Sequence, residues 1–356
     1  MTPSPAPRAT ESQVLAVLAG TPLEQTADQI PMDPTDLADA VEVYQAAGRA
    51  ALEAQPGACD WYQIRIQFTD WNSAEQIAAT HLGPHLHQAQ ETGILTDWWF
   101  LRKHPCWRLR CRCGPKTTAA SMKTAIAATL DSLVISGTVQ RWQESLYESE
   151  TLAFGGSQGM DIAHDLFHAD SHGILTYLRH NDPAAEPGTT AGRRELSILL
   201  CTTLFRSAWQ DEHEQGDIWH RVAQMRTLSS TAPAGRLHGM IPGLQRLIHM
   251  DTSPTGTLFG ADGSLSFAAP WSAAFAAAGR HLADTARDGT LQRGLRDVLA
   301  HHVIFHWNRL GLLVGTQAVL ARAARETLMN PPAHHGPANG PPGSRGQAVN
   351  DVVEAR

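Results

Sequence analysis

The spacing of hydrophobic and polar residues changes along the chain. Between residues 58 and 150, short runs such as WYQIRIQF at 61–68 alternate apolar and polar positions, as half-buried strands do. From residue 159 onward, apolar residues recur every three or four positions, as in amphipathic helices. The pattern predicts an α+β protein, with a sheet region followed by a largely helical region.

Strands and helices of the first region follow the order βαββαβ. Strands are predicted at 61–68, 98–102, 107–113 and 134–147, and helices at 73–92 and 116–133. A tight turn at His104-Pro105 joins the second strand to the third. This order is that of the ferredoxin-like arrangement, a four-stranded antiparallel sheet with helices on one face.

Long helices are expected in the second region, and a small helical unit before the first. The long helices are predicted at 159–180, 191–227, 270–287 and 291–327, with glycine-rich breaks at 181–192 and 251–264. Short helices within 13–57 form an acidic unit that either docks a partner or only packs; its charge does not favour reading DNA. The predicted organisation is a disordered segment at 1–12, this unit at 13–57, one domain at 58–328 (sheet 58–150, helices 151–328) and a disordered Pro- and Gly-rich tail at 329–356.

Composition narrows the class of protein. The formal net charge of −7 does not favour nucleic acid as a partner. Neither an apolar run long enough for a membrane span nor a secretory signal is apparent, so we expect a cytoplasmic protein. Five scattered cysteines suit reduced thiols better than a disulfide framework.

Three arginines of the predicted third strand are the first candidate for a binding site. Arg108, Arg110 and Arg112 share one face of that strand, because side chains alternate with a period of two. Arg65 and Arg102 on neighbouring strands are expected to join them. Guanidinium groups match carboxylates and peptide carbonyls, so the face is either a peptide-binding platform or a solvated surface.

Histidines mark two further candidates on predicted helices. His164 and His168 lie one turn apart; this spacing can bind zinc, but hydrogen bonding at a helix junction is the favoured interpretation. In the last helical segment, His302, His306 and Arg309 form a polar row inside an apolar helix. Such a row either lines a cavity or forms a core network, and we expect the cavity. The mixed charges after Gly192 favour ion pairing between helices.

Several motifs in order resemble one family, over about residues 60 to 328. WYQIRIQF, WWFLRKHPCWRLRCR, YESETLAFGGSQGMDIAHDLFHADS, RRELSILL and HHVIFHWNRLG resemble the SpaB C-terminal, or thiopeptide-type bacteriocin biosynthesis, family. The resemblance implies one of two reactions. One is elimination of glutamate from glutamylated Ser or Thr. The other is a formal [4+2] cycloaddition of two dehydroalanines, which forms a pyridine and expels the leader peptide.

The eliminase site that the resemblance implies is only partly present. Arg108 and Arg110 match its strand arginines, and Glu150 matches its glutamate. Ala153 stands where a second arginine is expected, and Phe154 replaces a tyrosine. His306 is available as a base, although Ile304 is the alternative match to the usual base position.

These departures favour the cycloaddition, which depends on positioning more than on ionised groups. The alternatives are the eliminase and a non-catalytic scaffold that binds the leader peptide. The interpretation assigns catalysis to Glu150, His306 and Asn308. It assigns binding of a precursor peptide to Arg65, Arg108, Arg110, Arg112, His302 and Arg309. It implies no metal and no organic cofactor, and it allows other biosynthetic enzymes as partners.

Overall fold

The computed structural model describes residues 7–29, 32–53, 61–115, 117–180, 192–227 and 234–330. The predicted disorder of residues 1–6 and of the tail from 331 lies outside this part of the chain. Residues 7–12, also predicted to be disordered, are helical.

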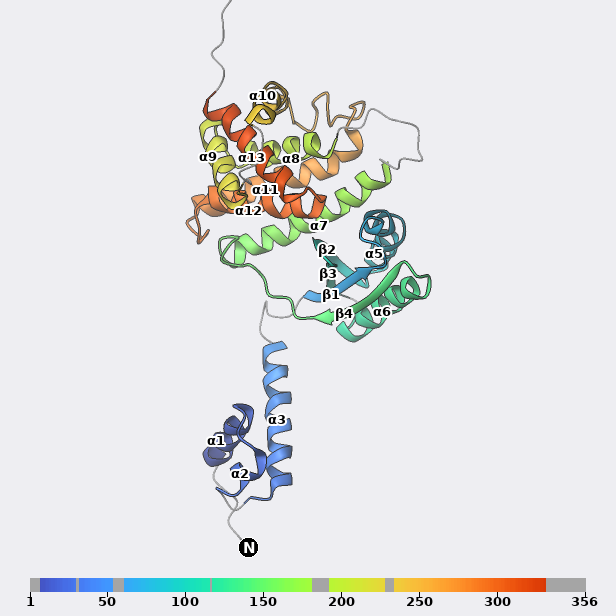
Figure 1. Ribbon diagram of the computed structural model, residues 1–356, viewed down its shortest axis with the longest axis vertical. Coiled ribbons are helices and arrows are strands. Elements are labelled where there is room, and N and C mark those ends of the chain that lie inside the picture. The colour runs from blue at the N-terminus through green and yellow to red at the C-terminus, as the bar shows by residue number, and fades with distance from the viewer. Residues whose placement is uncertain are drawn as a thin grey trace, which may run out of the picture.

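The predicted sheet is present, with every neighbouring pair of strands antiparallel. Its order is β2-β3-β1-β4. The strands are β1 (Trp61–Phe68), β2 (Leu95–Lys103), β3 (Cys106–Cys113) and β4 (Val139–Ser145). The helices of this region are α4 (Ala74–Ile77), the π-helical turn η1 (Ala78–Leu82), α5 (Gly83–Glu91) and α6 (Ala119–Ile135). α5 and α6 lie on one side of the sheet (Figure 1), where Leu86 and Ile126 share a core with Ile64.

The start of the fourth strand differs from the prediction. Residues 134 and 135 were expected in the strand, but α6 continues through Ile135, and Gly137 ends the turn with φ of 75°. β-branched residues favour strands only where a pleated surface can pack them, and Ile135 is exposed. The expected kink at Pro84 is replaced by the π-helical turn before it, so the proline falls in the first turn of α5.

The second region is helical, as predicted, but contains more helices than the hydrophobic pattern indicated. They are α7 (Ser157–His180), α8 (Arg193–Ser207), α9 (Glu212–Met225), α10 (Ala234–His249), the short η2 (Ser266–Ala268), α11 (Ala269–Arg287), α12 (Leu295–Leu310) and α13 (Val314–Met329). The predicted helix at 191–227 is divided before Asp211, whose side chain begins α9 with a capping box. The helix predicted at 291–327 is divided at Gly311, which adopts a left-handed φ of 78°. The prediction contained no counterpart of α10.

Helix α7 connects the sheet to the other helices (Figure 1). It runs beside the edge strand β2, where the imidazole of His168 lies 2.8 Å from the carbonyl of Trp98 and Ser171 Oγ accepts a hydrogen bond from the amide of Phe100. These side chains supply partners that a fifth strand would otherwise provide. Helix α7 thereby closes the β2 edge of the sheet. Its His164 also reaches the sheet face that carries Arg108, Arg110 and Arg112.

The small N-terminal unit consists of α1 (Pro7–Leu18), α2 (Leu23–Ala27) and α3 (Pro34–Glu53). Its helices pack on one another around Val14, Ala27 and Leu37. Among all the described helices, none is long and apolar enough to cross a bilayer.

Candidate functional site

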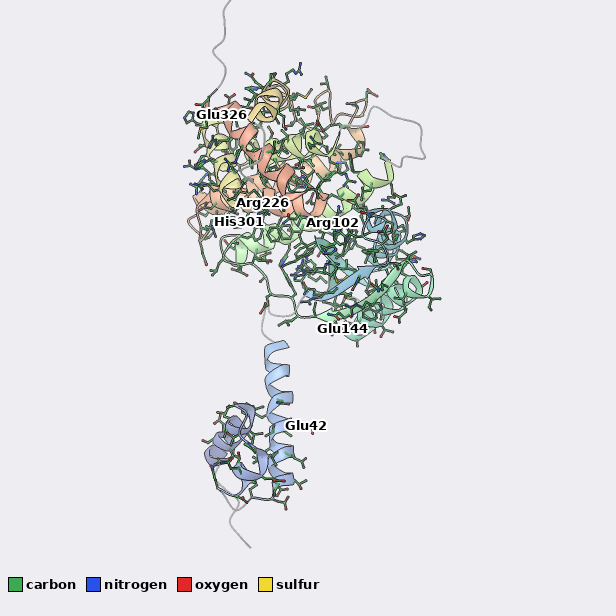
Figure 2. The ribbon with its side chains drawn as sticks, in the orientation of Figure 1. Glu42, Arg102, Glu144, Arg226, His301 and Glu326 are labelled. Atoms are coloured by element: carbon green, nitrogen blue, oxygen red, sulfur yellow. The ribbon has the colours of Figure 1, made fainter. Side chains whose placement is uncertain are left out.

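The arginines of β3 share one face of the sheet, as predicted. Trp107, Leu109 and Cys111 point into the core on the opposite face. Arg65 lies directly opposite Arg108 in the register of β1 and β3, and it is exposed. The expectation for Arg102 was wrong, because its guanidinium lies over Trp107 and pairs with Glu75 on the other face of the sheet. Figure 2 labels Arg102 where the sheet meets the helices.

Arg110 is the central group of the arginine face. It is only 1% exposed, and its guanidinium lies 4.0 Å from the ring centre of Trp99 and 4.8 Å from that of Tyr147. Its Nε donates to Gln63 Oε1 at 2.8 Å, while Nη1 has no hydrogen-bond partner within the described chain. Burial lowers the pKa of Arg110 to about 10, and nearby Tyr147 and Glu150 act against that effect. The residue therefore stays cationic near neutral pH, with one donor unused.

Tyr147 and His164 form a second layer beside Arg110. The Tyr147 hydroxyl lies 2.8 Å from His164 Nε2, and the tautomer of the imidazole decides which atom donates. Burial, together with Arg112 and Arg110, lowers the pKa of His164 to about 4, so its ring is neutral. Burial also raises the pKa of Tyr147, which keeps the phenol protonated. The two groups therefore hydrogen-bond to each other while both are uncharged.

Glu150 begins the turn that leads from β4 to α7 and lies beside the arginine face. It is partly buried, and its Oε2 has no partner among the residues the structure describes. Its backbone carbonyl accepts from the amides of Ala153 and Phe154. The turn continues through Gly155 at φ of 86°, a conformation that favours glycine. This backbone buries Phe154 against the rings of Phe167 and Phe305.

The polar row of α12 lies in the interior. His306 Nδ1 and Arg309 Nε bind the two carboxylate oxygens of Asp170, at 2.8 and 2.6 Å. Trp271 Nε1 also donates to Asp170, at 2.9 Å. Burial opposes ionisation of this carboxyl, but His306 and Arg309 outweigh it and hold the pKa of Asp170 below its ordinary value. His306 and Arg309 thus form the core network that the sequence left open as the alternative to a cavity.

The remaining predicted residues of α12 are separated from one another. His302 is 1% exposed beside Phe154, and neither of its ring nitrogens has a partner in the described part of the chain. Burial lowers the pKa of His302 to about 3. Asn308 accepts a hydrogen bond from Gln317 in α13, so it joins two helices. Of the three predicted catalytic residues, only Glu150 lies beside the arginine face.

An aromatic layer divides the arginine face from the Asp170 network. The Phe167 ring lies 4.8 Å from the ring of Trp99, measured between centres. The Arg309 guanidinium lies 4.3 Å from the centre of the same Phe167 ring. Phe305 of α12 stacks on Phe167 as well, at 5.2 Å. Packed phenylalanine rings therefore separate the arginine face from the buried polar row of α12, and the expectation that this row lines a cavity was wrong.

Several polar groups singled out in the sequence have structural partners. His168 binds the edge of β2, and Arg193 donates to Glu75 at 2.8 Å, an ion pair between α8 and α4. Over the described ranges, no group of three or more His, Cys, Asp or Glu side chains is arranged to hold a metal ion.

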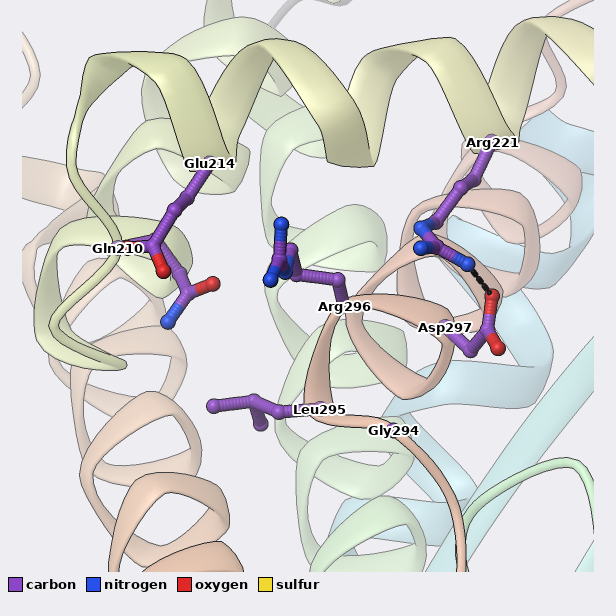
Figure 3. A pocket seen from close by; sticks show the side chains of 7 residues that line it. All are labelled: Gln210, Glu214, Arg221, Gly294, Leu295, Arg296 and Asp297. Atoms are coloured by element: carbon purple, nitrogen blue, oxygen red, sulfur yellow. Dashed lines mark hydrogen bonds and ion pairs between the residues drawn. The ribbon is translucent and has the colours of Figure 1, made fainter.

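A separate hollow of about 300 Å³ lies between α9 and the start of α12 (Figure 3). Its Arg221 pairs with Asp297, so charges there neutralise one another.

Sequence reasoning missed several residues of the candidate site and of the Asp170 network. Tyr147 was placed only at the end of a strand, and Trp99 only within one. Asp170 was one of several acidic residues on its helix. A usable signal for Asp170 was the polar pair at positions 306 and 309, because buried cations require a nearby carboxylate. The partner itself lies too far away in sequence for spacing to identify it.

A family comparison and a comparison with solved structures place the chain among known proteins. The family described as lantibiotic biosynthesis dehydratase C-term matches residues 61–328. The tRNA-dependent lantibiotic dehydratase MibB from Microbispora sp. 107891 is 16% identical, with a TM-score of 0.55, over 77% of this chain and 28% of MibB. TsrL is also 16% identical, with a TM-score of 0.50, over 75% of this chain and 95% of TsrL. No curated protein sequence matches the chain. At these identities the two structures establish a shared fold.

Proposed function

Because this chain belongs to the lantibiotic biosynthesis dehydratase C-terminal family, we propose that it modifies a precursor peptide in the biosynthesis of a ribosomal peptide natural product. We propose further that its reaction is the formal [4+2] cycloaddition of two dehydroalanines, with release of the leader peptide. The chain spans 28% of MibB, so the tRNA-dependent activity of that protein is not transferred as a whole.

One observation carries the choice of reaction. The arginine face combines a single buried cation, Arg110, with a layer of aromatic rings, while Ala153 stands where a second arginine is expected and the buried Ile304 is one of two matches to the usual base position. His306 is hydrogen-bonded to Asp170 inside the protein and is 1% exposed. An eliminase needs a base for the α-proton and cations for the departing carboxylate. Aligning two alkenes needs chiefly a shaped, apolar site.

The residues have simple roles in this proposal. Reaction through the iminol tautomer requires the amide N–H proton to move to the amide oxygen; the free Nη1 of Arg110 donates a hydrogen bond to that oxygen, and Glu150 Oε2 accepts from the N–H. Tyr147 and His164, both uncharged, hydrogen-bond to each other at the rim and add no fixed charge. Phe305, which is partly exposed, contacts the two alkenes, and the fully buried rings of Trp99 and Phe154 support it from behind. Arg108 and Arg65 bind carbonyl or carboxylate groups of the peptide outside the aromatic layer.

Glutamate elimination is the second candidate. Arg108, Arg110 and Glu150 favour it, since all three match the eliminase pattern. Mass spectrometry separates the two. With an already dehydrated peptide, the synthase releases intact leader and a cyclic product. Conversion of a glutamylated peptide to a linear dehydrated one would instead establish the eliminase, and no change of mass with either peptide would leave only a leader-binding scaffold.

The central role of Arg110 gives a quantitative prediction. Arg110→Lys keeps a cation but loses the planar fork that stacks on Trp99 and donates to Gln63. We expect the rate of product formation to fall by about 100-fold, the usual effect of removing one preorganised donor. Arg141→Lys, an exposed change on β4, is the matched control and should leave the rate unchanged. Equal rates for both variants would contradict the placement of the site.

A further inference from the structure

An apolar groove lies between α8, α10 and α13, at the end of the helical region away from the sheet (Figure 1). Its volume is about 440 Å³, and apolar side chains of all three helices line it, namely Ile198, Met240, Leu244, Leu247 and Leu320. Met240 and Leu247 are partly exposed there, so the groove presents apolar surface to solvent. Apolar grooves that stay open in this way are typical of surfaces that contact another molecule.

Two glycines line the groove although nothing inside the chain requires them. Gly239 and Gly243 lie one turn apart on α10. A Cβ atom added to either one would meet no atom within 4 Å among the described residues. Glycine is less stable than alanine inside a helix, so the pair weakens α10 without relieving any clash. What the glycines do allow is close approach of a second helix, because interaxial distance depends on the side chains at the contact.

The rim of the groove is cationic. Arg194 and Arg246 are both exposed, and neither has an ion-pair partner in the part of the chain that the structure describes. The lining contains one carboxylate, Glu195, which turns back against Gly192 at the start of α8. There it lies at the positive end of its own helix. Two guanidinium groups therefore remain available to carboxylates of a partner.

The N-terminal unit carries a surface of the opposite charge. Its described residues contain eight carboxylates and two arginines, so their net charge is −6, out of −7 for the whole chain. The family match begins at residue 61, and the unit therefore lies outside it. A small acidic unit of this kind favours contact with a cationic surface.

Helix α3 presents that charge together with an apolar side chain. Asp39, Glu42 and Val43 are exposed on the side of α3 away from Leu37, which belongs to the core of the unit. Figure 2 labels Glu42 on this side, away from α1 and α2. Val43 is 67% exposed. This side of α3 thus combines two carboxylates with an apolar residue between them, whereas the groove combines an apolar floor with two arginines.

We propose that α3 of one copy of the chain docks into the groove of a second copy. Asp39 and Glu42 pair with Arg194 and Arg246, and Val43 packs over the glycines of α10. The N-terminal unit and the groove lie at opposite ends of the molecule, so the contact joins two copies (Figure 1). Because it uses a different surface on each copy, the contact is head-to-tail and can repeat to form a ring or an open chain.

Sedimentation velocity of the full chain tests the contact. We expect the average mass to rise with protein concentration and to fall as salt screens the charge pairs. Gly243→Leu fills the groove and should leave the chain monomeric; its fold is retained, because leucine favours a helix more than glycine does. Gly315→Leu, an equally open position on α13 outside the groove, should associate like the unmodified protein. A monomer at every concentration, or association that survives Gly243→Leu, would overturn the proposal.

Charge reversal distinguishes a head-to-tail contact from other arrangements. Arg194→Glu with Arg246→Glu disables the groove, and Asp39→Arg with Glu42→Arg disables the unit. In each protein alone, the dissociation constant should rise by about 10-fold or more, because like charges then meet. A mixture of the two should form a 1:1 dimer and nothing larger, since only one working contact remains. Circular dichroism confirms that both variants are folded. A mixture without dimers, or with larger species, would reject the head-to-tail contact.

Discussion

Asp170 is the residue on which the interior of the helical region depends most. One carboxylate with no exposed surface binds an arginine, a histidine and a tryptophan from two other helices. A buried ion pair adds little stability over an apolar pair of the same shape, but removal of one partner leaves an uncompensated charge. The network therefore specifies how α7, α11 and α12 meet.

Asp170→Asn should be strongly destabilising. Arg309 would remain buried without a counter-charge, and we expect the free energy of unfolding to fall by about 3–5 kcal/mol. Urea denaturation followed by circular dichroism measures it. Asp161→Asn, an exposed position on the same helix, should change stability by less than about 0.5 kcal/mol. A small effect at position 170 would mean that the network is not maintained in solution.

His302 predicts the acid sensitivity of the fold. Its pKa is about 3 in the folded protein and about 6.5 in the unfolded chain, so the unfolded state takes up a proton first as the pH falls. Its contribution is complete above pH 6.5 and is lost progressively toward pH 3. Between pH 6.5 and about pH 5, this histidine should account for a loss of about 2 kcal/mol.

The variant His302→Phe isolates that effect. Phenylalanine cannot titrate, and it suits a site lined by Phe154 and Phe167. The difference in unfolding free energy between the two pH values should therefore shrink by about the same 2 kcal/mol in the variant. His164, whose pKa is about 4, is unchanged in both proteins and accounts for part of the remaining slope. Identical pH profiles would contradict burial of a neutral His302.

At the scale of elements, the end of α12 joins the sheet to the helices. Gly311 ends the helix in a left-handed conformation, and the guanidinium of Arg102 lies against it. Arg102 is held there by Glu75, which also binds Arg193 of α8. A single carboxylate thus links α4, β2 and α8 beside the turn that begins α13.

Gly311→Ala tests this junction. Alanine is strained at φ of 78°, and its Cβ would displace Arg102 from Glu75. We expect a loss of about 2 kcal/mol in thermal or urea unfolding. Gly315→Ala is the control, because its Cβ would meet no atom within 4 Å and lies in helix α13. That change should be neutral or stabilising by up to about 1 kcal/mol.

At the scale of the whole molecule, the N-terminal unit has a core of its own. Val14, Ala27 and Leu37 pack together, whereas the large core runs from the sheet through all the later helices. We expect a chain that begins at residue 58 to unfold within about 2 °C of the full chain, since a change of 1 kcal/mol corresponds to about 2–4 °C at this size. A scanning calorimeter measures it. A large drop would show that the unit stabilises the rest of the chain.

The local pattern of the chain was sufficient for the order of helices and strands in the sheet region, although not for the start of the fourth strand. Alternation in WYQIRIQF and the period of two in Arg108, Arg110 and Arg112 follow from the geometry of a strand, which depends on neighbours in sequence. The same reasoning failed in the helical region. It missed the end of α12, where Gly311 adopts a left-handed conformation, and the start of α9, where the Asp211 side chain caps the helix. Periodicity continues across such points, so it does not reveal them.

The sequence by itself determined the α+β class, the order of strands and helices in the sheet region, and the arginine face. Each of these depends on spacing within a few residues. Only the tertiary structure decided which polar groups meet. Residues 170 and 306 are far apart along the chain, yet Asp170 binds His306 in the core, while Asn308, two positions on, turns to α13. Hydrogen bonds and burial between distant helices depend on how the helices pack, and packing decides whether a histidine faces a substrate or a buried carboxylate.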